Sequence, residues 1–233
     1  MGPMAQRTTQ RRSRGTAAVC KPPKQPVYSL PGLAAGPGRL EPEESYDGLE
    51  FSGLDLSGAG APGASFLECA LRDCRFDEAR LGRVRIADSL VERAHGVGTD
   101  LAEAQLRDVD VRDAHLGGTQ LSGAALTRVR ISGGKLVYLN LRQSRLVDVV
   151  FSGCVLVEPD FAGARLTRVS FEDCELRGAD FSQATLADVD LRGAARLELA
   201  RGAERLSGAV LSPSQLLDLA PVLAAALGVR VAS

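Results

Sequence analysis

The chain has 233 residues, of which 45% are apolar and only 4% aromatic, with no tryptophan. A core without large rings has to be filled by Leu, Val and Ala, as in repeat solenoids. No stretch approaches the roughly 18 consecutive apolar residues of a membrane span, and the N-terminus lacks an apolar run of signal-peptide length. We therefore expect a cytoplasmic protein with no membrane partner.

A basic tail precedes a mildly acidic body. Residues 1–39 carry seven basic side chains and no acidic one, which leaves 21 basic and 29 acidic side chains for the remainder. The Lys-Pro-Pro-Lys-Gln-Pro run at residues 21–26 disfavours helix and strand alike. We predict disorder for residues 1–45. The tail is either a solvated leader or an electrostatic arm, and we expect direct nucleic-acid binding only through it.

A five-residue period dominates the following part of the chain. Every fifth residue from Phe51 to Leu191 is apolar, with Gly96 as the exception among 29 positions. The residue two before each is small and mostly apolar. Neither the 3.6-residue period of a helix nor the two-residue period of a strand produces this pattern. The pattern indicates a chain that turns a corner every five residues.

Individual repeats carry a family resemblance. The segments 164–168 (Ala-Arg-Leu-Thr-Arg) and 179–183 (Ala-Asp-Phe-Ser-Gln) resemble the pentapeptide-repeat consensus, Ala-(Asp/Asn)-(Leu/Phe)-X-X. The resemblance extends over residues 46–195. It implies an all-β fold, a right-handed quadrilateral β-helix with four repeats in each coil, and about seven coils fit. Residues that are four repeats apart then stack on adjacent coils.

This stacking assigns roles to the cysteines and marks one weak coil. Cys69, Cys74, Cys154 and Cys174 fall on the small inward position, and Cys20 lies in the tail. Cys154 and Cys174 stack closely enough for a disulfide, but we expect reduced thiols that fill alanine-sized slots in the core. No Cys-x-x-Cys spacing indicates zinc. Gly96, with small or polar residues nearby, predicts a bend or irregularity in its coil.

Residues 196–233 form a predicted C-terminal cap with an α-helix at about 213–227. Ser212, Pro213 and Gln215 are typical of a helix start, and Pro221 should kink or split the helix. An apolar stripe follows at helical spacing, comprising Leu216, Leu219, Leu223 and Leu227. The helix serves either as a lid alone or as a lid and homodimer contact. The resemblance implies the second role, because gyrase-protecting family members often dimerise through their C-terminal ends.

Two groups of outward residues are candidate contact sites. The first is a basic stripe with one residue on each successive coil, made of Arg75, His95, His115 and Lys135. It fits an anion or partner site, a metal pair, or a plain basic face. The second is an apolar patch on neighbouring coils, made of Val97, Val137, Tyr138, Val155 and Val157. Exposed apolar clusters often mark protein contacts.

One edge of the predicted rod alternates in charge from coil to coil. It reads Asp108 and Asp110, Arg128 and Arg130, Asp148, Arg168, then Asp188 and Asp190. Opposite charges on neighbouring strands attract by roughly 0.2–1 kcal/mol per pair, so these ladders stabilise the rod. A mimic of DNA would instead need unpaired carboxylates spaced like phosphates.

Nothing in the sequence indicates catalysis. It contains no nucleophile elbow, phosphate loop or paired-carboxylate pocket, so we expect no catalytic residue, no cofactor, no metal site and no enzyme activity. We predict a non-catalytic protein-interaction scaffold. The alternative implied by the resemblance is a DNA mimic that binds DNA gyrase or a related topoisomerase and confers resistance to gyrase-targeting antibiotics.

Overall fold

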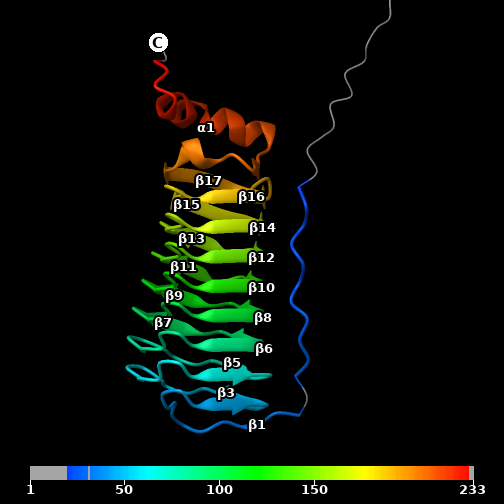
Figure 1. The fold of residues 1–233 in the computed structure, drawn as a ribbon, viewed down its shortest axis with the longest axis vertical. Coiled ribbons are helices and arrows are strands. Elements are labelled where there is room, and N and C mark those ends of the chain that lie inside the picture. The colour runs from blue at the N-terminus through cyan, green and yellow to red at the C-terminus, as the bar shows by residue number, and fades with distance from the viewer. Residues whose placement is uncertain (1–19, 31, 231–233) are drawn as a thin grey trace, which may run out of the picture.

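The computed structural model describes residues 20–30 and 32–230, which form a right-handed, four-sided parallel β-solenoid of about eight turns with one C-terminal helix (Figure 1). This confirms the predicted fold class, with one turn more than expected. The first elements are β1 (Ala34–Ala35), β2 (Ser45–Asp47), β3 (Leu49–Ser52), β4 (Ser65–Leu67), β5 (Ala70–Arg72), β6 (Arg85–Glu92), β7 (His95–Val97), β8 (Gln105–Arg112), β9 (His115–Gly117) and β10 (Ala125–Ser132). The later ones are β11 (Lys135–Val137), β12 (Arg145–Ser152), β13 (Val155–Val157), β14 (Arg165–Glu172), β15 (Cys174–Asp180), β16 (Thr185–Asp190), β17 (Ala194–Arg201), η1 (Ala203–Arg205), β18 (Ala209–Val210) and α1 (Pro213–Ala226).

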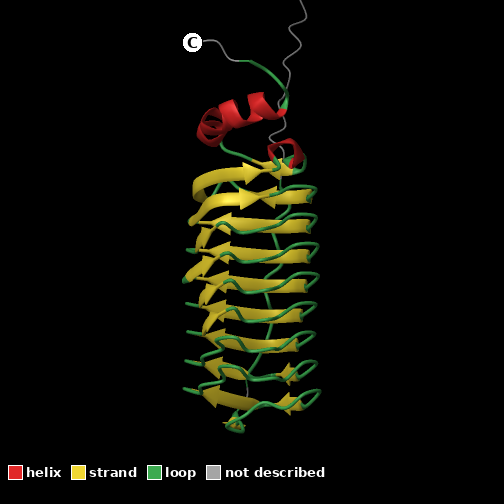
Figure 2. Cartoon of the chain, turned by 90° about the vertical axis from the view of Figure 1, so that its left-hand side faces the viewer, coloured by secondary structure: helices red, strands yellow, loops and turns green. Residues whose placement is uncertain are grey.

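Each coil consists of four five-residue repeats throughout most of the rod. Strands of one 12-stranded sheet pair in parallel with partners one coil away, for example Val109 with Val129 and Val129 with Val149. This sheet covers two sides of the rod, and a six-stranded sheet from β7 to β17 forms the third. Isolated bridges such as Asp100 to Gln120 form the fourth side, and the strands stack along the length of the rod (Figure 2). This strict register makes every surface feature a column that runs along the rod.

Every corner of the rod has a left-handed backbone. Each fifth residue from Glu43 to Asp188 has a positive φ of about 50–70°. Glycine reaches this region without strain, and short polar residues tolerate it better than β-branched ones. These positions hold glycine, acidic, basic or amide residues, with Tyr138 as a bulky exception, and none is β-branched. The corner requirement therefore explains one of the polar positions of each repeat.

Large and small side chains alternate in the core as the period predicts. Phe151 stacks on Phe171 at a ring-centroid distance of 4.9 Å, and Phe161 stacks on Phe181 at 5.0 Å. The four inward cysteines are buried free thiols, and burial raises the pKa of Cys69 and Cys74. Thiols with this burial act as small apolar side chains.

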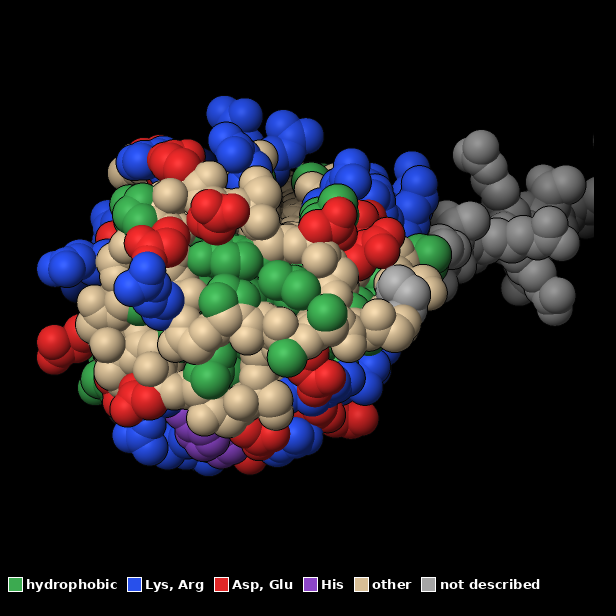
Figure 3. Space-filling model, turned by 90° about the horizontal axis from the view of Figure 1, so that it is seen from below, with side chains coloured by type: hydrophobic (Ala, Val, Ile, Leu, Met, Phe, Trp, Pro, Cys, Tyr) green, Lys and Arg blue, Asp and Glu red, His purple; other side chains and the backbone are tan. Residues whose placement is uncertain are grey.

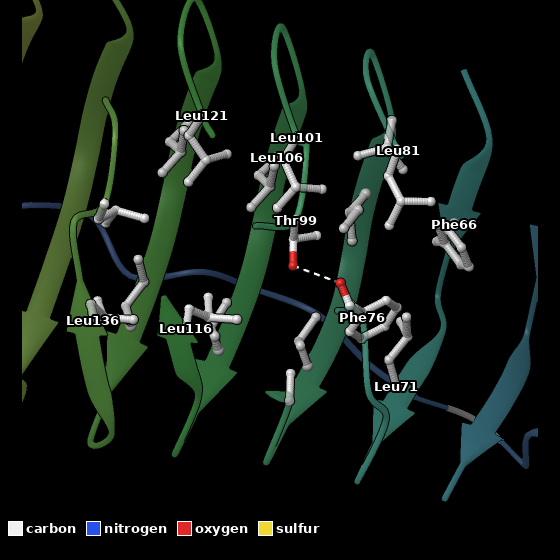
Figure 4. Close-up of a pocket in the computed structure, with 18 residues that line it drawn as sticks. Phe66, Leu71, Phe76, Leu81, Thr99, Leu101, Leu106, Leu116, Leu121 and Leu136 are labelled. Carbon is white, nitrogen blue, oxygen red and sulfur yellow. Dashed lines mark hydrogen bonds between the residues drawn. The ribbon is translucent and has the colours of Figure 1, made fainter. Parts of the chain in front are cut away.

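The bend expected at Gly96 is absent. His95 pairs with His115 and Gly96 with Leu116 in unbroken register. The Thr99 side chain reaches into the space that a larger residue 96 would occupy, and its hydroxyl donates to the Phe76 carbonyl at 2.8 Å. A cavity of about 110 Å³ extends along the rod from Phe66 to Leu139, and its lining is apolar except for Thr99 (Figure 4).

The C-terminal end closes the rod as predicted for a lid. β17 pairs with β15 with register shifts, and α1 lies over the last coils (Figure 1). Ser212 and Gln215 form a capping box, and the Gln215 side-chain amide donates to the carbonyls of Leu191 and Ala194 at 2.8 and 3.0 Å. The helix continues through Pro221 as one element, so the predicted split is wrong. Within the described ranges, no helix has the length and apolarity to cross a membrane.

The predicted disorder of the tail is wrong for the part that the structure describes. Residues 20–30, which we call the strap, descend along the outside of the rod towards its N-terminal end (Figure 1). Ala34 and Ala35 then pair with β3, so the solenoid begins before residue 46. Residues 1–19 of the predicted tail lie outside the described residues. The strap has a defined course because side chains of the solenoid hydrogen-bond to its backbone.

Candidate interaction surfaces

The two contact sites predicted separately lie on one face of the rod. The three-residue strands β7, β9, β11 and β13 place their middle residue inward and its two neighbours outward, and the longer β15 does the same with Leu176 between Glu175 and Arg177. One outward column contains His95, His115, Lys135 and Val155, and the next contains Val97, Gly117, Val137 and Val157. We call this surface the β7–β15 face. It combines a basic stripe with an apolar strip.

The histidines of the stripe stack on each other. The ring centroids of His95 and His115 are 5.3 Å apart at an interplanar angle of 20°. Arg75, on the coil before His95, pairs with it through an isolated backbone β-bridge. Arg75 itself pairs with Asp77 at 3.4 Å. No cluster of three or more potential metal ligands occurs in the part of the chain that the structure describes. The stripe is thus a row of parallel rings and cations that can face an anionic or aromatic group.

Tyr138 is the most unusual residue of the apolar patch. Its side chain is 57% exposed and its backbone is left-handed at φ 53°, a conformation that disfavours bulky residues. Val97 is 66% exposed on the same face, whereas Val137, Val155 and Val157 are half-buried. Tyr138 therefore projects from the corner next to the strip.

A surface pocket that was not predicted from the sequence adjoins Tyr138. It has a volume of about 380 Å³ and lies where the β7–β15 face meets the next side of the rod. Its lining comprises Tyr138, Asn140, Glu158, Pro159, Asp160, Gly178, Asp180, Ala200 and Arg201. The acidic pair at 160 and 180 is spaced by one coil, a signal that was present in the sequence. The pocket offers carboxylates beside an exposed aromatic ring.

The charge ladders pair with themselves as predicted. Arg128 donates through Nε to Asp108 at 2.6 Å, and Arg168 donates through Nε and Nη2 to Asp148 at 2.6 and 2.8 Å. These guanidinium groups lower the pKa of both carboxyls. From the N-terminal end of the rod, positive and negative side chains are interspersed around the rim (Figure 3). The rim is therefore not a continuous acidic surface.

The strap covers the column that contains these aspartates. The backbone N–H groups of Lys21, Lys24 and Val27 donate to one carboxylate oxygen each, of Asp188 at 3.3 Å, Asp148 at 3.0 Å and Asp108 at 3.2 Å. This site was not predicted from the sequence. The available signal was an outward column with apolar members, Ala70, Leu90 and Val150, all of which are buried. Apolar residues at outward positions are buried only when another segment of the chain packs over them.

The helical stripe predicted as cap or dimer contact divides into two parts. Leu219 is 3% exposed and Leu223 is half-buried, so these two face the rod. Leu216 and Leu227 are exposed, as is their neighbour Leu217. The helix therefore acts as a lid through one side and presents an apolar surface on the other.

Comparison with known proteins agrees with this architecture. A family model described as a pentapeptide repeat region matches residues 144–198, and one described as pentapeptide repeats (8 copies) matches residues 104–137. None of the curated proteins compared matches the chain.

Solved structures share the fold at low sequence identity. A trypsin-treated variant of QnrB1, a plasmid-mediated fluoroquinolone resistance protein, has a TM-score of 0.51 at 18% identity, covering 85% of this chain and 96% of that one. HetL, a pentapeptide repeat protein involved in heterocyst differentiation regulation from the cyanobacterium Nostoc, is 20% identical over 74% of this chain and 91% of that one, with a TM-score of 0.34. The five-residue period, the four-repeat coil and the two family matches together show that residues 104–137 and 144–198 consist of pentapeptide repeats.

Proposed function

We propose that this protein is a non-catalytic interaction scaffold whose protein partner binds the β7–β15 face. The contact comprises Val97, Val137, Tyr138, Val155 and Val157, with the basic stripe of Arg75, His95, His115 and Lys135 beside it. A rigid rod holds these side chains in fixed columns, with about 4.8 Å between successive members of a column, so the partner meets a surface that needs no ordering on binding.

The observation that carries this proposal is the conformation and exposure of Tyr138. An aromatic side chain that is 57% exposed gains nothing from the core, and its left-handed backbone costs free energy that glycine would avoid. The equivalent corner residues on the two preceding coils are Gly98 and Gly118. Aromatic residues are enriched among the side chains that dominate protein interfaces. Binding a partner gives the exposed ring a role that folding does not.

Serine substitutions test the face directly. We expect Val137→Ser with Tyr138→Ser to abolish co-purification of the partner while the melting temperature changes little, because both side chains are partly or largely exposed. Gln143→Ser is the matched control, since Gln143 occupies the next corner of the same coil, is exposed and has φ 56°. Unchanged co-purification and unchanged oligomeric mass for the double variant would refute the proposal.

DNA gyrase is the second candidate partner. Two features favour it: the excess of acidic side chains in the body and the rod shape shared with QnrB1, a fluoroquinolone resistance protein. The paired ladders weigh against it, because Arg128 and Arg168 neutralise the carboxylates that a DNA mimic would display. A supercoiling assay with purified gyrase decides between the candidates. If micromolar protein neither inhibits gyrase nor protects it from the drug, this function is excluded.

We further propose that α1 contributes to a homodimer. The exposed leucines 216, 217 and 227 form an apolar surface at the end of the rod. Joining two such ends would bury them and make a longer rod with two β7–β15 faces. Light scattering on a Leu216→Glu, Leu217→Glu variant tests this, and a monomeric mass for the unsubstituted chain would refute it.

The buried free thiols support a reducing, cytoplasmic location.

A further inference from the structure

The strap has the composition of a polyproline II helix. Pro22, Pro23 and Pro26 interrupt any ladder of backbone donors, and the strap belongs to no helix or strand. Its N–H groups at residues 21, 24 and 27 all donate to the solenoid. The donors recur at every third residue, which is one turn of a polyproline II helix.

The acceptors on the solenoid have a matching spacing. Asp188, Asp148 and Asp108 occupy the same column and recur on every second coil of the rod. Two coils rise by about 9.6 Å, since parallel strands are about 4.8 Å apart. One turn of polyproline II rises by about 9.3 Å, at roughly 3.1 Å per residue. Donors and acceptors therefore stay in phase over the length of the strap.

Alternation of charge sets this acceptor period. On the intervening coils, Arg128 and Arg168 each reach back and bind the preceding carboxylate through a bidentate contact. The contact orients the aspartate, and the Oδ1 that accepts from the arginine Nε also accepts from the strap N–H. A column of aspartates alone would repel itself and would offer acceptors at half the spacing. The alternating column therefore offers the strap one acceptor on every second coil.

The strap also lies over an apolar floor with a polar end. Leu90 and Val150 occupy outward positions of the neighbouring column, yet both are buried. Towards the N-terminal end of the rod, the Tyr28 hydroxyl donates to Asp110 at 3.2 Å and accepts from Arg112 at 3.0 Å. We call this surface, defined by Asp108, Asp148, Asp188 and the buried column beside them, the strap groove.

We propose that the strap groove is a binding site for proline-rich segments of partner proteins that carry a peptide N–H at every third residue, and that the strap is its resident intramolecular ligand. A partner of this kind has to displace residues 20–30. The groove lies on a different side of the rod from the β7–β15 face, so this proposal does not depend on that one.

Tethering explains why the groove is occupied in the free protein. A segment linked by a short stretch of chain has an effective concentration in the millimolar range, so it outcompetes a free peptide of equal intrinsic affinity. Loss of its backbone donors should release it. Proline at residues 24 and 27 removes two donors while it preserves the polyproline II conformation. Proline at residue 25 is the control for the backbone donors, because no hydrogen bond from the Gln25 N–H to the solenoid occurs among the described contacts; it removes only the side-chain contact in which Gln25 Oε1 accepts from Arg130 at 3.3 Å.

The binding experiment uses the full chain and a labelled peptide with the sequence of residues 20–30, in which Cys20→Ser prevents oxidation. We expect fluorescence anisotropy to show saturable binding to the Lys24→Pro, Val27→Pro variant at least tenfold tighter than to the unsubstituted chain or to Gln25→Pro. Adding Asp148→Asn to the variant should weaken the peptide at least tenfold. Equal affinity for all chains, no binding to the variant, or insensitivity to Asp148→Asn would each overturn the proposal.

A second measurement needs no substitution. Hydrogen exchange of the unsubstituted chain should protect the amides of Lys24 and Val27 at least tenfold more than that of Gln25. Equal exchange at the three positions would show that the N–H contacts do not hold the strap, and would overturn the proposal independently of how the variants fold.

Discussion

Removal of one buried carboxylate tests the physical basis of the charge ladder. In Asp148→Ala, the Arg168 guanidinium loses a bidentate partner and the Lys24 N–H loses its acceptor. The Asp148 side chain is only 5% exposed, and breaking a buried ion pair costs about 3–5 kcal/mol. Arg168 is 28% exposed and regains some hydration, so we expect a loss of about 3 kcal/mol in the free energy of unfolding. For a chain of this size, this corresponds to a fall in melting temperature of roughly 6–12 °C.

Asp73→Ala is the matched control. Asp73 accepts from Arg93 through the same bidentate contact, at 2.6 and 2.7 Å, one coil away and with a similar left-handed backbone. Its side chain is 48% exposed, and the strap does not cover it. Exposed pairs of this kind contribute little because water replaces the lost partner. Thermal unfolding followed by circular dichroism should show a much smaller shift for Asp73→Ala. Equal shifts for the two variants would refute the argument that strap burial strengthens the ladder.

Three further predictions concern the strap, the cavity and the cap. Because the pKa values of Asp108 and Asp148 are lowered in the folded protein, these carboxylates stabilise the fold fully above the ordinary aspartate pKa of about 3.9 and lose this effect as pH falls through the lower folded value. The NMR signals of the strap amides should therefore persist at pH 5 and shift only in stronger acid. Gly96→Leu combined with Thr99→Ala should fill part of the cavity of about 110 Å³ and raise stability in denaturant titrations, by less than the roughly 2.6 kcal/mol that the whole volume represents, whereas Gly96→Leu alone should destabilise because it meets the Thr99 hydroxyl. Gln215→Ala should release α1 and speed its cleavage by protease with little change in the solenoid, and unchanged cleavage would contradict the capping role.

The repeat was predictable from sequence because a period of five leaves its mark at every turn. Phe151 and Phe171 stack as expected since the same inward position recurs on every coil. The same regularity predicted the pairing of Asp148 with Arg168, because column neighbours follow from register alone. The helix from Pro213 to Ala226 was predictable because its capping residues act locally.

Features that depend on tertiary contacts were missed. Residues 21–26 have the composition of a disordered segment, and their order comes from aspartates 124 and 167 residues away in sequence. Burial of Leu90 and Val150 at outward positions was the available clue. Gly96 predicted a bend, whereas the Thr99 side chain takes the space beside it and the register continues unbroken, a compensation that depends on packing between coils.

The central functional claim is that a protein partner contacts the β7–β15 face at Tyr138. Photo-crosslinking tests it most directly, with Tyr138→benzoylphenylalanine compared with Gln143→benzoylphenylalanine on the next corner of the same coil. We predict that, in cells that produce this protein, the probe at residue 138 captures one defined protein and the probe at residue 143 does not. Equal capture at both positions, or capture at neither, would contradict the assignment of this face.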